Sequence, residues 1–150
     1  MTVTNTSDDG CGILITGSNA KVELFDVALK GCDRFALDMP YSTSETTVVA
    51  TRCEFANNRF CGAVVNGSLT SATFNNCVFH DNSQDGIQGT RSTIHLHGEA
   101  TAIHSNKRYG IFAYVSSKVI IHLPSHHNTI YNNGGEDRKT LLGASITNVE

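Results

Sequence analysis

Three segments of one design decide the fold: NRFCGA at residues 58–63, NSQDGI at 82–87 and NKRYGI at 106–111. Each segment begins with an asparagine and carries a glycine four positions later, and consecutive segments start 24 residues apart. A small residue stands five positions before each asparagine, and a large apolar residue stands three positions before it. These paired positions are Cys53 and Phe55, Cys77 and Phe79, and Thr101 and Ile103.

The same columns continue toward the N-terminus, with a spacing of 26 residues where the turn-like stretch 40–45 adds length. Extra residues in such a polar turn cost little free energy. A fixed period with many matching columns identifies a repeat protein. The apolar columns are Val22, Val48, Ala72 and Leu96; Leu29, Phe55, Phe79 and Ile103; Leu37, Ala63, Ile87 and Ile111; and Met39, Val65, Gly89 and Ala113.

Each repeat contains three short segments in which apolar and polar residues alternate, and this pattern predicts strands. Helical solenoids repeat every 33 to 47 residues or so, which is longer than the 24-residue period of this chain. A rung of three strands fits, with rungs ~4.8 Å apart and right-handed connections. We therefore predict an all-β fold: a right-handed parallel β-helix of about five rungs in residues 1–133. Residues 134–150 are expected to form a C-terminal capping segment, in which Leu141, Leu142 and Ile146 fold over the last rung.

The asparagine and glycine columns have a physical explanation. A rung must turn sharply between strands, and asparagine tolerates the left-handed backbone conformation that such a corner needs. Stacked asparagine side chains can also bond to one another as a ladder. Glycine permits the next tight corner. The expected ladder residues are Asn58, Asn82 and Asn106, and the corner glycines are Gly62, Gly86 and Gly110.

The pattern small-x-Phe-x-x-Asn-x-x-x-Gly-Ile resembles the parallel β-helix repeats of the pectate-lyase-like superfamily, and it covers about residues 11–133. The closing residues 122–149 look similar to the last segment of repeat proteins from microalgae and large viruses. The resemblance implies the fold. It does not select an activity, because the superfamily contains lyases, hydrolases, epimerases and non-catalytic modules.

The catalytic motifs of these enzymes are not matched. The hydrolase resemblance stops at Asp85-Gly86, and the epimerase resemblance stops at Tyr109-Gly110. We therefore expect no catalytic residue and favour a non-catalytic module that presents a binding or assembly surface. A fragment of a polysaccharide lyase, hydrolase or epimerase is the alternative, and a purely structural or viral surface element is a further one. Calcium-dependent lyases carry clustered aspartates, whereas the outward positions after the glycine corner are Leu14, Asp38, Val64, Gln88 and Phe112.

The composition argues against some classes of binding partner. The net charge of −3 and the pI near 6.1 argue against nucleic acid, which needs a basic stripe. No run of 18 apolar residues is present, so we expect no membrane partner. The first residues, MTVTNTSDD, lack the features of a signal peptide, and the compartment is left unassigned. Cys53 and Cys77 share an inward column, as a stack of core thiols or, alternatively, as a disulfide between rungs.

Three histidines are candidate metal ligands. His95 and His97 are two positions apart on one strand and should both point outward. If the extra residues of the next rung precede Ile121, His122 lies over His95 and His126 lies over Glu99. Histidine and carboxylate groups suit zinc or another divalent ion. A polar face open to solvent is the simpler interpretation of His95, His97 and His122, and we expect no cofactor.

An aromatic face is the candidate binding surface, with a polysaccharide or other glycan as the expected ligand. Aromatic rings can stack against sugars, and polar side chains beside them can bond to hydroxyl groups. Scattered surface aromatics are the alternative. The N-terminal end has no evident cap, so we expect it to be covered either by self-association or by residues outside this sequence. The candidate ligand-binding residues are Asp85, Gln88, Arg108, Tyr109, Phe112 and Tyr114.

Overall fold

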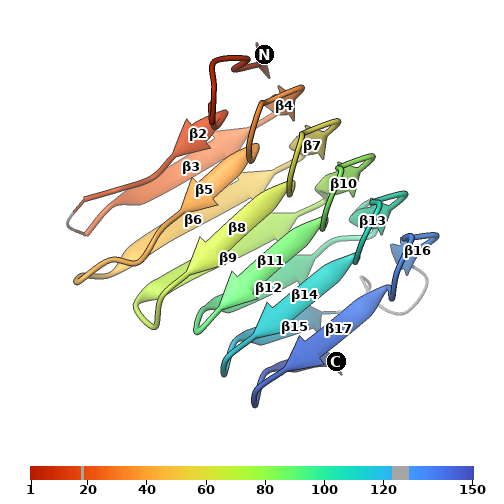
Figure 1. Ribbon diagram of the computed structural model, residues 1–150. Helices are drawn as coiled ribbons and strands as arrows, with labels where there is room; N and C mark the ends of the chain where they lie inside the picture. The colour runs from red at the N-terminus through yellow and green to blue at the C-terminus, as the bar shows by residue number, and fades with distance from the viewer. Residues whose placement is uncertain (18, 123–128) are drawn as a thin grey trace.

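The computed structural model describes residues 1–17, 19–122 and 129–150 as an all-β solenoid of three parallel sheets (Figure 1). Each sheet has six strands among these residues, so the chain makes about six turns where the repeat pattern predicts about five. No helix in this part of the chain is long and apolar enough to cross a membrane.

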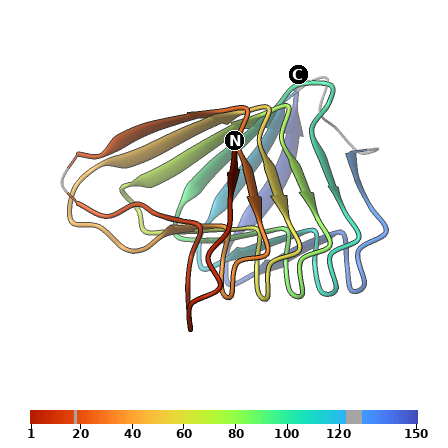
Figure 2. The ribbon, with the colours of Figure 1, turned by 90° about the horizontal axis from the view of Figure 1, so that it is seen from above.

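Three strands make up each turn, and Figure 2 shows the turns stacked one after another. Sheet A consists of β1 (Thr2–Val3), β4 (Ala28–Lys30), β7 (Glu54–Ala56), β10 (Val78–His80), β13 (Ala102–His104) and β16 (Ile130–Tyr131). Sheet B consists of β2 (Ile13–Leu14), β5 (Leu37–Met39), β8 (Ala63–Asn66), β11 (Ile87–Thr90), β14 (Ile111–Tyr114) and β17 (Arg138–Leu141). Sheet C consists of β3 (Lys21–Phe25), β6 (Thr46–Thr51), β9 (Thr70–Asn75), β12 (Thr93–His97), β15 (Lys118–His122) and β18 (Ser145–Val149).

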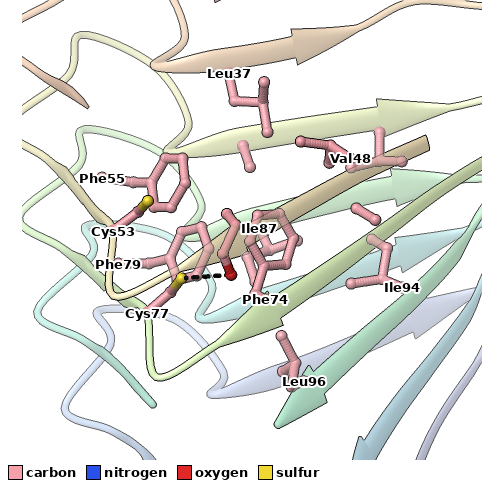
Figure 3. Close-up of a cluster of buried hydrophobic side chains, with 14 of the residues drawn as sticks. Leu37, Val48, Cys53, Phe55, Phe74, Cys77, Phe79, Ile87, Ile94 and Leu96 are labelled. Carbon is pink, nitrogen blue, oxygen red and sulfur yellow. Dashed lines mark hydrogen bonds between the residues drawn. The ribbon is translucent and has the colours of Figure 1, made fainter. Parts of the chain in front are cut away.

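The register of the strands confirms three of the four sequence columns; in the fourth, Ala72 stands beside Ile94, and the predicted Leu96 stands beside Phe74. Phe55 pairs with Phe79, and Phe79 pairs with Ile103. These side chains are fully buried between the sheets. The Phe55 and Phe79 rings stack with centroids 4.5 Å apart, and Phe74 from sheet C packs edge-on against Phe79 at 4.9 Å (Figure 3). Burial of these apolar columns is the main source of stability in such a fold.

The cysteine column belongs to this core. Cys53 and Cys77 are buried free thiols on successive turns, as Figure 3 shows. The Cys77 thiol lies 3.3 Å from the carbonyl oxygen of Ala50. The stack of core thiols is therefore confirmed, and the alternative of a disulfide between rungs is not formed.

The asparagines form the expected ladder. Nδ2 of Asn58 donates to Oδ1 of Asn82 at 2.9 Å, and the same 2.9 Å bond links Asn82 to Asn106 and Asn106 to Asn133. The backbone N–H of each asparagine donates to the amide oxygen of the next at 3.1–3.2 Å. At the far end, Asp137 accepts from Nδ2 of Asn133 at 2.8 Å. The ladder is thus longer than the three asparagines that the repeat predicts.

The reason for the ladder asparagines differs from the predicted one. The left-handed residue is the one before each asparagine, with φ of 56° at Asn57, 55° at Asp81 and 56° at Ser105. The preceding residue makes the sharp bend, and the asparagine uses its side chain to satisfy the backbone of the corner.

The corner glycines also have another role than the predicted one, because their φ values are not positive. A Cβ atom at Gly62 would lie 2.6 Å from the carbonyl oxygen of Gly86, and one at Gly86 would lie 2.7 Å from that of Gly110. Glycine is required because the next turn passes too close for any side chain.

The last segment closes the solenoid as a further turn, and it does not fold over the end as we expected. β17 pairs with β14, and β18 pairs with β15. Leu141 and Leu142 are exposed, whereas Ile146 packs against the core. Arg138 and Thr140 occupy the positions that Ile111 and Ala113 hold one turn earlier. The apolar columns of sheet B therefore end in polar residues.

Candidate functional site

The aromatic residues chosen from the sequence lie together, on β14 of sheet B and at the corner that precedes it. The ring centroids of Tyr109 and Phe112 are 5.4 Å apart, and those of Phe112 and Tyr114 are 5.7 Å apart. The guanidinium of Arg108 lies over Tyr109 at 4.8 Å and over Phe112 at 5.2 Å. Phe112 is only 7% exposed, so its ring supports the two half-buried tyrosines. We call these four residues the aromatic cluster.

Asp85 was expected at this surface, but its side chain is completely buried beneath the corner. One of its oxygens accepts a hydrogen bond from the backbone N–H of Tyr109 at 3.1 Å, and the other lies 3.9 Å from Arg108. Burial raises the pKa of the Asp85 carboxyl, although the Tyr109 hydrogen bond and the Arg108 charge act in the opposite direction. Asp85 therefore positions Tyr109 and Arg108 and cannot itself reach a ligand.

Gln88 is half-buried beside the aromatic cluster, since β11 places it next to Phe112 of β14. It also lines a hollow of about 400 Å³ that extends toward the N-terminal turns. Gln88 therefore joins the aromatic cluster to this hollow.

The hollow contains a second pair of rings that the sequence analysis missed. Phe35 and Phe60 meet edge-on with centroids 6.0 Å apart. Arg34 lies over Phe35 at 4.8 Å, and Arg59 lies over Phe60 at 5.6 Å. A signal for them was present: an arginine followed by an aromatic residue occurs just before the corner at 34–35, 59–60 and 108–109. The remaining lining residues of the hollow are Asp9, Gln84 and Gln88.

The two groups of rings are connected by one row of residues that runs parallel to the solenoid axis. The backbone N–H of Gln84 donates to the carbonyl of Phe60, and that of Arg108 donates to the carbonyl of Gln84. Phe60, Gln84 and Arg108 are therefore neighbours on three successive turns. We call this row, together with Phe35 and the aromatic cluster beside it, the aromatic strip.

A larger hollow of about 610 Å³ lies beside the asparagine ladder. Its lining includes Asp33, Asn57, Arg59, Ser83 and Lys107, and no aromatic residue. Arg59 is already paired with Asp33 at 3.3 Å. This hollow is polar and lacks a stacking platform, so the aromatic strip is the better candidate surface despite its smaller hollow.

The histidines chosen as candidate metal ligands also come together, although in a different register. β12 pairs with β15 so that Leu96 stands beside Ile121, which places Ile120 beside His95 and His122 next to His97. The His97 and His122 rings stack with centroids 3.9 Å apart, and Nδ1 of His95 lies 2.9 Å from Nε2 of His122. The prediction that His122 lies over His95 is therefore wrong, because the register of β15 against β12 differs from the predicted one by two residues. His126, expected over Glu99, lies outside the described residues.

The ligand atoms of His95, His97 and His122 all lie within 4.8 Å of one another, and all three side chains are half-buried. Burial lowers the pKa of His95 below its ordinary value, and the charge of His122 adds to this effect. Burial lowers the pKa of His97 as well, followed by the charges of His122 and His95. The His95 and His97 rings are consequently neutral at neutral pH. We call the three residues the histidine cluster.

A second histidine stack occurs on sheet A, where the His80 and His104 rings lie 5.2 Å apart. Its electrostatics are different, because His80 bonds to Asp81 at 2.5 Å and to Glu54 at 2.7 Å. Burial alone would lower the pKa of His80, but the bonds to the two carboxylates outweigh it and the pKa is raised. Lys30 binds the other oxygen of Glu54 at 2.8 Å.

The cysteines outside the Cys53–Cys77 column, which are Cys11, Cys32 and Cys61, are not activated as nucleophiles. Cys61 is fully buried, and its thiol lies 3.9 Å from Asp85. Burial, with the charge of Asp85, raises the pKa of Cys61 to about 12. Burial raises the pKa of Cys11 and Cys32 too. These three thiols are therefore protonated at neutral pH, which is the unreactive form.

Comparison with known proteins adds one finding about the family. A family model described as a right-handed β-helix region matches residues 2–148, which is nearly the whole chain. Searches of curated proteins and of solved structures gave no match to the chain. The match agrees with the three parallel sheets and their repeating columns. The chain thus belongs to the right-handed β-helix family.

Proposed function

We propose that this chain is a non-catalytic β-helix module that binds a carbohydrate along the aromatic strip. The observation that carries the proposal is the row of rings and guanidinium groups at one corner of the solenoid. Phe35, Phe60 and Tyr109 each lie within 6 Å of an arginine guanidinium. A surface that repeats along an axis suits a ligand that is itself a repeating polymer.

The dimensions of the strip agree with this proposal. Successive turns are ~4.8 Å apart, so the three turns from Phe35 to Tyr109 span about 14 Å. That length accommodates a short oligosaccharide. Rings at the two ends can stack against the apolar faces of sugars, and Gln84 and Gln88 between them offer amide donors and acceptors to hydroxyl groups.

The arginines add to the binding surface. Arg34 and Arg108 are both exposed, and each guanidinium carries several N–H donors in a fixed plane. Each guanidinium carbon lies 4.8 Å from the centroid of a ring, so charged donors stand next to the stacking surface. Small-molecule sites commonly combine apolar surface with a few polar groups in this way.

The test is a glycan-array screen with the full chain, followed by titration of the best ligand. Tyr109→Ala and Tyr114→Ala should weaken binding by about tenfold or more, as expected of an aromatic residue at the centre of an interface. Tyr41→Ala is the matched control, because Tyr41 is an exposed tyrosine with Arg91 over its ring at 6.0 Å but lies outside the aromatic strip. Absence of any retained glycan, or equal effects of all three substitutions, would refute the proposal.

A further inference from the structure

The histidine cluster lies on sheet C, away from the aromatic strip on sheet B, and the binding proposal does not use it. We propose that His95, His97 and His122 form a site for a divalent transition-metal ion, with zinc as the ion it takes. His95 and His97 come from β12 and His122 from β15, which are neighbouring strands of the same sheet (Figure 1).

The spacing of the three rings is close to that of a zinc site. A zinc–nitrogen bond is about 2.0–2.1 Å long, so two nitrogens of a tetrahedral site are about 3.3 Å apart. In the free protein one pair of ring nitrogens is 2.9 Å apart, and all the ligand atoms lie within 4.8 Å of one another. Small rotations of the side chains therefore bring all three nitrogens to the ion, while the paired strands stay fixed.

The contact between His95 and His122 points to an ion in particular. Nδ1 of His95 and Nε2 of His122 face each other at 2.9 Å, so one ring must present a proton and the other its lone pair. A metal ion replaces that shared proton, because each ring can carry its hydrogen on the other nitrogen. The same two nitrogens then both offer lone pairs to the ion.

The ligand set selects the class of metal. Three imidazoles suit zinc, copper, nickel and iron, whereas calcium and magnesium require oxygen ligands. Three protein ligands leave the fourth position of a zinc tetrahedron open to water or to a group of a bound molecule. The site is thus of the open kind.

The positions of the histidines are also exceptional within their columns. One turn before β12, the residues beside His95 and His97 are Thr73 and Asn75. Either would satisfy a polar face open to solvent. Three imidazoles instead meet on two turns, with their ligand atoms within 4.8 Å of one another. The polar face that the sequence favours does not account for this convergence.

The experiment is calorimetric titration of the full chain with zinc chloride, together with the visible absorption of bound Co²⁺ as a measure of tetrahedral geometry. Wild type should bind one zinc ion per chain in a chelator-reversible manner. His97→Ala and His122→Ala should each weaken binding by about 100-fold or more, since loss of even a supporting residue costs 10- to 100-fold. His97→Gln repeats the test with a polar side chain of similar size.

Two controls separate this site from casual binding. His104→Ala removes a half-buried histidine that stacks on only one other histidine, and it should leave zinc affinity unchanged. The double variant His126→Ala/His127→Ala removes the adjacent histidine pair from the sequence and should also bind normally. The melting temperature and circular dichroism of each variant without zinc show that it is folded. Wild-type binding that is absent, or that survives His97→Ala and His97→Gln but falls in the double variant, would overturn the proposal.

Discussion

Replacing Asn82 by alanine tests whether the ladder holds the corners of the solenoid together. Asn82 is completely buried and makes four side-chain hydrogen bonds. Its Nδ2 donates to the carbonyl of Phe55 at 3.1 Å and to Oδ1 of Asn106 at 2.9 Å. Its Oδ1 accepts from the backbone N–H of Asn58 at 3.2 Å and from the Asn58 amide at 2.9 Å.

The magnitude follows from the groups that lose their partner. Oδ1 of Asn106 keeps the backbone N–H of residue 82, which alanine also has. Three bonds to other groups are lost: those of the Phe55 carbonyl, the Asn58 N–H and the Asn58 amide hydrogen. A buried polar group without a partner costs about 1–3 kcal/mol, so the substitution should lower the free energy of unfolding by about 3 kcal/mol or more. For a chain of this size that corresponds to a fall of about 6–12 °C in melting temperature.

Asn133→Ala is the matched comparison. Asn133 also belongs to the ladder, but it is only half-buried and lies at the end beside Asp137. Water can reach the groups that it leaves, so a loss of about 1 kcal/mol is expected. Urea unfolding followed by circular dichroism gives both free energies, provided that the slope against denaturant is unchanged. Equal losses for the two variants would refute a ladder whose strength comes from burial.

Three further predictions follow from the geometry. Gly86→Ala should destabilise the fold by several kcal/mol in the same assay, because the added Cβ would lie 2.7 Å from both the Gly110 carbonyl and a methyl group of Ile103. Because the pKa of His80 is raised, this group stabilises the folded state fully below pH 6.5, and the effect is lost as pH rises through the raised pKa. Burial acts to raise the pKa of Glu54, but its bonds to Lys30 and His80 outweigh burial and the pKa is lowered. Glu54 therefore stabilises the folded state above pH 4.5, and this effect is lost on acidification. His80→Ala should therefore cost most stability near pH 5.5 and clearly less near pH 9, and a pH-independent loss would contradict this. Light scattering after size exclusion should show self-association of this chain, because Ile13, Val22 and Leu24 are only partly buried whereas the residues paired with them on the next turn are fully buried. A strictly monomeric species would contradict this prediction.

Most of the fold could be predicted because every turn of a solenoid must fill the same cross-section, so similar residues recur at a fixed spacing. Phe55, Phe79 and Ile103 recur at one spacing, and each pairs with the next in the structure. The last turn was harder to predict. Arg138 and Thr140 take inward positions where the column is otherwise apolar, so the apolar pattern ends one turn before the strands do.

The candidate sites were predicted less completely, for reasons that lie in the strand pattern itself. Val119, Ile121 and Leu123 alternate with polar or outward residues, so two registers that differ by two positions fit sheet C equally well. Only pairing with β12 decides between them. The burial of Asp85 could not be predicted either, because it depends on how Arg108 and Tyr109 close over it. The composition of a corner does not reveal which of its residues lies beneath the others.

Both candidate sites of this chain lie at positions where a column departs from its repeating residue type. Inward positions repeat because each turn must fill the same cross-section, and ladder positions repeat because each corner has the same backbone groups to satisfy. Outward positions carry no such requirement. Along the outward column of sheet B the residues change from Asp38 through Val64 and Gln88 to Phe112. The repeat therefore does not fix the residue type at these positions, and a cluster of like side chains there needs an explanation other than the repeat itself. The aromatic strip and the histidine cluster both meet that criterion, and they do so on different sheets, so each can be abolished by substitution while the other is left intact.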